Sequence, residues 1–200
     1  MVQVTSSPPT FQAAPNGKVR WTIDLVYAAD AAGFFKPGDR YELIDGELLL
    51  MSPPKPPHQA AVRKVVRMLR QAIAAETGLE IETGGPSGLG DFDVPVPDIM
   101  LIRDDLYEDR HPGADDTFLI VEVANSHPER DRQPKRQQYA RFDIADYWIV
   151  DLKKKELVVH RDPQNGDYQQ VTVWQDDTIT LARLPQVSVN MEALRQWIFS

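Results

Sequence analysis

Two carboxylates interrupt apolar segments of this chain, where an apolar side chain would be expected. Asp98 follows Pro97 and opens the segment DIMLI, and Glu122 lies between Val121 and Val123. A buried charge is costly unless it is neutralised, paired or bound to a metal ion. Carboxylate oxygens suit Mg²⁺ or Mn²⁺, and such an ion can activate water for attack on a phosphodiester. The pair therefore predicts a divalent-metal site with the chemistry for phosphodiester cleavage.

A polar segment after the second carboxylate carries Asp131, Lys135 and Tyr139 at intervals of four residues. This spacing places the three side chains on about one face of a helix. Lys135 could then reach the two strands and steady the attacking hydroxide or the phosphate. The alternatives are that Asp98 caps the entrance to its strand and that Glu122 pairs with an arginine. Lys135 could equally be a solvated helix residue, and Tyr139 could simply pack in the core.

Further candidates follow a proline-rich stretch. His58 begins a predicted helix and could contact a phosphate or a metal-bound water, or it could cap the helix. Arg63, Arg67 and Arg70 share one face of that helix. These arginines could follow a DNA backbone, or they could form an ordinary solvated face opposite the apolar stripe. Tyr139 is a further candidate for a DNA contact.

The elements that would position these residues alternate between strands and helices. Asp45-Gly46 joins two apolar runs and predicts a hairpin, because both residues tolerate a positive φ. A helix is expected over 133–142, after the second carboxylate strand and before the strand over 147–152. Pro134 would lie in its first turn. A start at Ser126 is the alternative, and it would leave Pro134 inside the helix. Other expected helices and strands are a short helix capped by Thr22, a helix over 58–77 ending at Gly78, strands over 79–82, 98–102, 117–124 and 147–152, and a terminal helix capped by Asn190.

Composition limits the class of protein. The 200 residues, 42% hydrophobic and 26% charged, suit one globular domain over 21–200 after a disordered segment over 1–20. The absence of cysteine excludes disulfides and thiolate chemistry. The net charge of −8 provides no global attraction for nucleic acid, so any DNA contact needs local basic patches. No secretion signal is evident, and no apolar run approaches the roughly 18 residues typical of a membrane span, so we expect a cytoplasmic protein without a membrane partner.

Six segments follow one another along the chain: YELIDGELLLMSP, His58, PVPD, IVEVANS, the trio at 131, 135 and 139, and DYWIVDL. Together they resemble the Uma2 family of the PD-(D/E)xK nuclease superfamily. The resemblance implies a restriction-endonuclease-like fold of the α/β (α+β) class, with a mixed β-sheet flanked by helices and an N-terminal helix and hairpin. It also implies DNA cleavage dependent on Mg²⁺ or Mn²⁺, with Asp98 and Glu122 as metal ligands and Glu47 as an accessory acid.

The superfamily lysine stands two residues after the second carboxylate, and Ala124 occupies that position here. Lys135 is the candidate to replace it. The sequence thus predicts a DNA endonuclease that uses activated water. The alternative is a catalytically inactive nucleic-acid-binding or interaction protein on the same fold. A homodimer is expected for the nuclease, because a DNA duplex presents two strands related by near two-fold symmetry.

Overall fold

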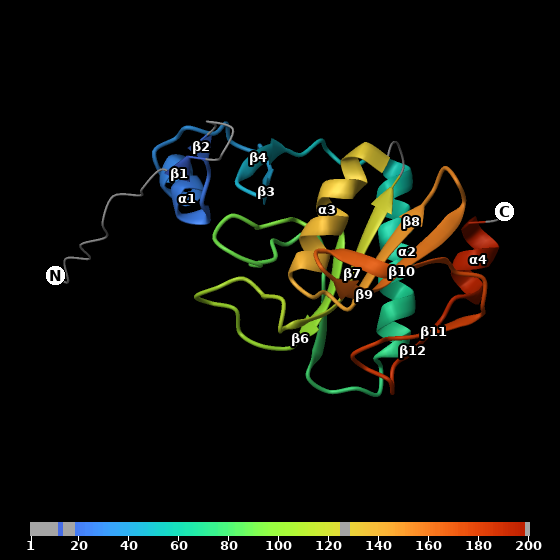
Figure 1. The fold of residues 1–200 in the computed structure, drawn as a ribbon. Helices are drawn as coiled ribbons and strands as arrows, with labels where there is room; N and C mark the ends of the chain where they lie inside the picture. Colours follow the sequence, from blue (N-terminus) through green and yellow to red (C-terminus); the bar gives the residue numbers. More distant parts are fainter. Residues whose placement is uncertain (1–11, 14–18, 125–128, 199–200) are drawn as a thin grey trace.

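A six-stranded mixed sheet forms the centre of the molecule (Figure 1). This computed structural model describes residues 12–13, 19–124 and 129–198. The strand order is β10-β9-β8-β7-β6-β5, and only β7 and β8 run parallel. The sheet flanked by helices confirms the predicted fold class. Its strands are β5 (Leu79–Glu82), β6 (Ile99–Arg103), β7 (Thr117–Ala124), β8 (Asp146–Asp151), β9 (Glu156–Gln164) and β10 (Asp167–Val173).

The parallel pair requires a crossover, and α3 (Glu129–Arg141) provides it. The predicted start at residue 133 was wrong, because the helix begins at Glu129 and contains Pro134. The alternative start, at Ser126, lies outside the described residues. A proline inside a helix removes one backbone hydrogen bond. Two residues of this helix, Tyr139 and Ala140, are buried in the core, and the free energy gained by this packing outweighs that cost.

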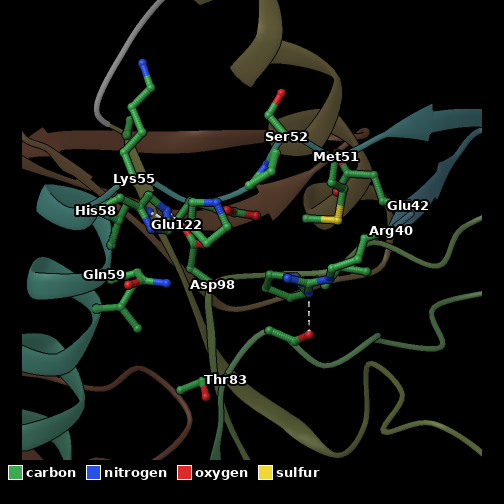
Figure 2. Close-up of a pocket in the computed structure, with 18 of the residues that line it drawn as sticks. Arg40, Glu42, Met51, Ser52, Lys55, His58, Gln59, Thr83, Asp98 and Glu122 are labelled. Atoms are coloured by element: carbon green, nitrogen blue, oxygen red, sulfur yellow. Dashed lines mark hydrogen bonds and ion pairs between the residues drawn. The ribbon is translucent and has the colours of Figure 1, made fainter. Parts of the chain in front are cut away.

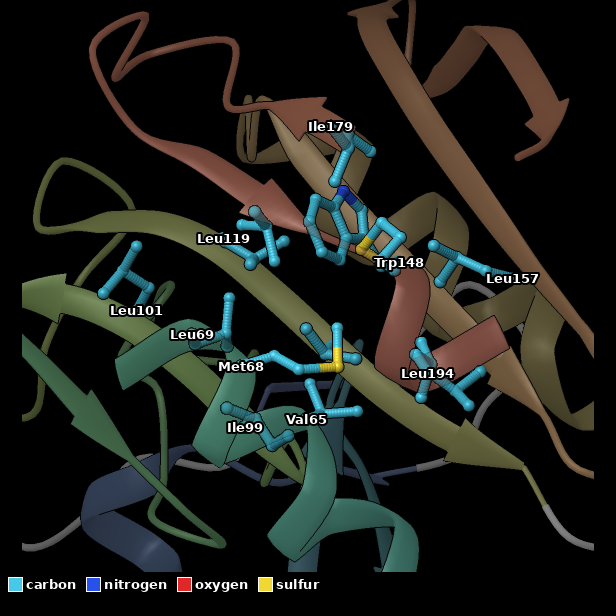
Figure 3. Packing of buried hydrophobic residues seen from close by; sticks show 14 of the residues in the cluster. Val65, Met68, Leu69, Ile99, Leu101, Leu119, Trp148, Leu157, Ile179 and Leu194 are labelled. Atoms are coloured by element: carbon cyan, nitrogen blue, oxygen red, sulfur yellow. The ribbon is translucent and has the colours of Figure 1, made fainter. Parts of the chain in front are cut away.

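The longest helix, α2 (Pro56–Ala72), packs on the opposite face of the sheet from α3 (Figures 1 and 3). Pro56 and Pro57 occupy its first turn, where a missing N–H costs nothing. The helix ends five residues before the predicted end at 77, and Gly78 (φ 79°) shapes the turn into β5 instead. The main core lies between α2 and the sheet and includes Val65, Met68, Leu69, Leu119, Trp148 and Leu194.

The N-terminal part begins with α1 (Ile23–Ala31), whose predicted cap is confirmed because Thr22 Oγ1 accepts from the Leu25 amide. The predicted hairpin is also confirmed: β3 (Tyr41–Ile44) and β4 (Glu47–Leu50) are joined by Asp45 (φ 50°) and Gly46 (φ 77°). Leu43 and Val94 exchange two backbone hydrogen bonds, which fasten the hairpin to the loop that enters β6. This attachment brings β3 beside the carboxylate strands.

The segment expected to be disordered contains two short strands, β1 (Gln12–Ala13) and β2 (Val19–Arg20), which pair with each other. Residues 1–11 and 14–18 lie outside the described part of the chain.

The C-terminal part contains an unpredicted strand, β12 (Ser188–Asn190), which pairs with β11 (Thr178–Thr180). The cap predicted for the last helix, α4 (Glu192–Ile198), is confirmed, since Asn190 Oδ1 accepts from the Glu192 amide. Across the described ranges, no helix has the length and apolarity needed to cross a membrane.

His160 on β9 is buried beneath the α3 side of the sheet, where its ring contacts Tyr147 and Tyr168. Its Nδ1–H donates to the Tyr147 carbonyl. Burial lowers the pKa of His160 from 6.5 to about 4, and the nearby positive charge of Arg136 acts in the same direction. The folded state therefore holds this ring neutral at pH values where the unfolded chain protonates it.

We expect His160 to make the protein less stable as the pH falls from about 6.5 to about 4. In this window the unfolded state binds a proton that the folded state excludes, so this residue lowers the free energy of unfolding by up to roughly 3 kcal/mol. Chemical denaturation of wild type and His160→Phe at pH 7.5, 5.5 and 4.5 isolates this contribution. The stability of His160→Phe relative to wild type should rise as the pH falls. A difference in unfolding free energy between the two proteins that does not change with pH would contradict the neutral, buried state of His160.

Candidate active site

The strand register brings the two predicted carboxylates together. Strands β6 and β7 are antiparallel with Ile99 opposite Val121, so the next position places Asp98 opposite Glu122. The alternation of side chains along the strands puts both carboxylates on one face of the sheet. Direct cross-strand neighbours have Cβ atoms about 4.5–5.5 Å apart. Both carboxylates also line one cleft, so a single ion between them is geometrically reasonable.

Asp98 is held through one of its two oxygens. Its Oδ2 accepts hydrogen bonds from His58 Nε2 at 3.0 Å and from the Val123 amide at 2.7 Å. The bond to Asp98 raises the pKa of His58, although partial burial opposes the shift. His58 lies in the first turn of α2, so the start of that helix fixes this carboxylate. Asp98 Oδ1 has no hydrogen-bond partner among the described residues and is not fully buried.

Glu122 is held in the same one-sided way. Its Oε1 accepts from Lys135 Nζ at 2.9 Å and from the Tyr139 hydroxyl at 3.0 Å, two donors one turn apart on α3. Lys135 Nζ also lies 2.7 Å from Glu42 Oε2 on β3, and that ammonium is the only partner of this buried oxygen in the described part of the structure. Glu122 Oε2, like Asp98 Oδ1, has no such partner and is not fully buried.

Burial and neighbouring charges set the protonation states. Burial raises the pKa of Glu122 to about 7; Lys135 lowers it and Asp98 raises it further. Burial alone would lower the pKa of Lys135, but Glu122 and Glu42 raise it above its usual value. Lys135 therefore stays an ammonium and cannot act as a base at neutral pH. Burial also raises the pKa of Tyr139, which keeps its hydroxyl a hydrogen-bond donor.

Glu42, Asp98, Glu122 and Lys135 line a cleft of about 720 Å³ (Figure 2). His58, Asp98 and Glu122 gather on the α2 side, and Arg40 and Met51 lie across the opening. Arg40 Nη2 donates to the Gly84 carbonyl at 2.8 Å, which fixes the far wall. This volume is within the usual range for ligand clefts.

The donor set fits a hard divalent cation. Mg²⁺ usually takes one or two protein carboxylates, and waters and substrate phosphates complete its octahedral shell. Asp98 Oδ1 and Glu122 Oε2 supply two such oxygens. Among the residues that the structure describes, no group of three or more His, Cys, Asp or Glu side chains could hold a metal on its own. The two carboxylates therefore suit an ion whose other ligands are waters, some of which a substrate phosphate can replace.

The structure brings Asp98, Glu122, Lys135 and His58 together as predicted, but not Glu47. Glu47 is exposed on β4 and does not line the cleft. The acid that reaches the site from the hairpin is Glu42, which the sequence prediction missed. The sequence around Glu42 resembles that around Glu122, because Glu42 also interrupts a short apolar strand, YELI.

The structure corrects the predicted DNA contact at Tyr139, whose side chain is fully buried. Tyr139 packs in the core, as the alternative interpretation expected, and its hydroxyl donates a hydrogen bond to Glu122. Glu122 pairs with a lysine instead of the arginine considered as an alternative, and Lys135 is largely buried instead of solvated. Asp131 lies in α3, but its side chain is outside the described part.

Comparison with known proteins agrees with the predicted family. The family profile Uma2, described as "Putative restriction endonuclease", matches residues 27–192. The chain belongs to the Uma2 family. Its fold is similar to that of "a putative nuclease belonging to DUF820" from Anabaena variabilis, with a TM-score of 0.66 and 15% identity over 88% of this chain and 98% of that one.

A more distant similarity, to a DrdV–DNA complex, has a TM-score of 0.32 and 13% identity over 70% of this Uma2 chain and 14% of the other. None of the curated proteins compared with the chain matches it.

Lys135→Met should destabilise the protein by about 3 kcal/mol, because it leaves Glu42 and Glu122 buried without their shared cation. Glu122→Gln should cost less, since Lys135 keeps its ion pair with Glu42. Urea denaturation at pH 8, above the pKa of about 7 that Glu122 has beside Lys135, measures both. Exposed Lys153→Met is the matched control and should change the free energy of unfolding little. Equal stability of the two lysine variants would contradict a structural ammonium at position 135.

Proposed function

We propose that this Uma2-family chain is a metal-dependent endonuclease that hydrolyses phosphodiester bonds in DNA with water as the nucleophile. The observation that carries the proposal is the paired placement of Asp98 and Glu122. Each is fixed through one oxygen and leaves the other for a ligand, and a buried ammonium lies 2.9 Å from the second carboxylate. The family match and the nuclease-like fold support the same chemistry.

Asp98 Oδ1 and Glu122 Oε2 would hold Mg²⁺ or Mn²⁺. When bound, such an ion lowers the pKa of a water ligand and offsets the charge that develops on the phosphate. The backbone amide of Val123 and the ring of His58 keep Asp98 in its orientation. His58 therefore acts as a positioning residue for Asp98.

Lys135 would supply the positive charge that the superfamily places two residues after the second carboxylate. Ala124 cannot do so, but the crossover helix α3 places the Lys135 ammonium beside Glu122. Its raised pKa makes it a fixed charge. We assign to it the stabilisation of the phosphate or the orientation of the attacking water, and no proton transfer.

A second candidate function has an observation in its favour. The Lys135 ammonium contacts both Glu42 and Glu122, so two carboxylates already neutralise its charge. A site whose cation is occupied in this way could bind nucleic acid without cutting it. The predicted homodimer and cytoplasmic location stay predictions.

The cleavage proposal predicts that purified protein nicks supercoiled plasmid DNA in the presence of Mn²⁺ or Mg²⁺. Asp98→Asn and Glu122→Gln should each lower the rate on the order of 10²-fold or more, because the loss of a group that stabilises the transition state has effects of this size. Glu47→Gln removes an exposed acid outside the cleft and should retain the rate. Binding of DNA without nicking by wild type would favour the second candidate.

His58→Ala should weaken Mn²⁺ binding about 10–100-fold, as expected when a residue that orients a metal ligand is lost. Isothermal calorimetry without DNA measures the affinity directly. Gln59→Ala is the matched control, because Gln59 is the adjacent cleft residue and makes no hydrogen bond to Asp98. Equal Mn²⁺ affinity of wild type and His58→Ala would contradict the positioning role.

A further inference from the structure

A second hollow of about 580 Å³ adjoins the cleft along the side of α2. It shares three lining residues with the cleft, Val62, Arg63 and Thr83, so the two hollows form one continuous depression. From that shared part it continues past Arg67 to Arg70. We call the part lined by these residues, with Val66, Gln71 and Ala74, the α2 groove.

The α2 groove is positively charged although the chain as a whole is negative. Arg63, Arg67 and Arg70 are all exposed, and none makes an ion pair with another residue that the structure describes. Among the residues that the structure describes, no acidic side chain lines the groove. The net charge of the chain is −8, so this local cluster of three guanidinium groups has no counterpart in the overall field.

The neighbouring edge strand does not cancel this charge. Leu79 and Ile81 on β5 pack against the core on the α2 side. Side chains alternate along a strand, so Glu80 and Glu82 point to the opposite face of the sheet. The acidic side chains of β5 therefore do not lie on the side of the sheet that carries the arginines.

The spacing of the arginines suits a polyanion. A helix rises 1.5 Å per residue, so the row from Arg63 to Arg70 is about 10 Å long. The row presents three guanidinium groups in line, and each can contact a phosphate, so it can neutralise about two or three phosphates of one DNA strand, beginning beside the cleft.

The floor of the α2 groove indicates backbone contact instead of base stacking. Val62, Val66 and Ala74 contribute apolar surface of a kind that suits deoxyribose. Proteins that hold single strands usually stack bases on aromatic side chains. In the described part of the chain no Phe, Tyr or Trp lines the groove, and Tyr147 is the one such residue that lines the cleft, where it is buried.

We infer that the α2 groove binds the sugar–phosphate backbone of one strand of a DNA duplex as that strand leaves the catalytic cleft. This inference rests on the proposed function for its ligand. Arg67 and Arg70 line only the α2 groove and make no contribution to the cleft, so their loss tests the groove separately from the metal site.

The test measures binding of a fluorescein-labelled 30-base-pair duplex by anisotropy, in EDTA and at salt concentrations from 50 to 200 mM. Each phosphate contact contributes about −0.9 to the slope of log K against log salt. Arg67→Gln/Arg70→Gln should therefore make the slope less negative by about 1.8. The matched control is Lys36→Gln/Lys153→Gln, which removes the same charge from two exposed lysines outside both hollows and should leave the slope nearly unchanged.

The outcomes separate this inference from the proposed function. A wild-type slope in the arginine variant, or an equal change in the lysine control, overturns the groove even if wild type cleaves plasmid DNA. A smaller slope in the arginine variant alone supports the groove, and it does so even if wild type fails to cleave with Mn²⁺, which would overturn only the nuclease. Absence of duplex binding by wild type overturns the groove. Circular dichroism and thermal melting verify that both variants are folded.

Discussion

The buried ammonium of Lys135 is the interaction on which the rest of the site depends. It joins the hairpin strand β3, the central strand β7 and the crossover helix α3 through contacts to Glu42 and Glu122. Without it, acids from two elements would lie close together in a poorly solvated site, and Asp98 would add to the repulsion. A cation shared by two partly buried carboxylates offsets their desolvation only when the geometry is good, and this geometry requires the three elements to be packed together.

The same interaction explains how the site is divided between fixed and available atoms. Lys135 and Tyr139 engage one oxygen of Glu122, and His58 and the Val123 amide engage one oxygen of Asp98. The remaining oxygens face the cleft with their carboxylates already oriented. Functional sites gain from such preorganisation, because little freedom is left to lose when a ligand binds. The α2 groove, which is continuous with the cleft, adds positive charge beside this arrangement.

Local patterns in the sequence were sufficient for several elements and for the core of the site. Asp98 and Glu122 could be recognised because each interrupts an apolar strand, and Asp45-Gly46 predicted its hairpin because both residues adopt positive φ. Boundaries that depend on competing forces were predicted less well. The rule against a proline inside a helix placed the start of α3 too late, because it ignored the packing that a crossover helix gains on the sheet around Tyr139.

The sequence by itself determined the fold class, the two carboxylates and a lysine at a spacing that could reach them. Only the tertiary structure decided which acid completes the site, because Glu42 and Lys135 are far apart in the chain and meet through the docking of the hairpin. It also decided that Tyr139 serves Glu122 from the core, since burial depends on which face of α3 meets the sheet. Charge and periodicity can be predicted from neighbouring residues, whereas the pairing of buried charges depends on how distant elements pack.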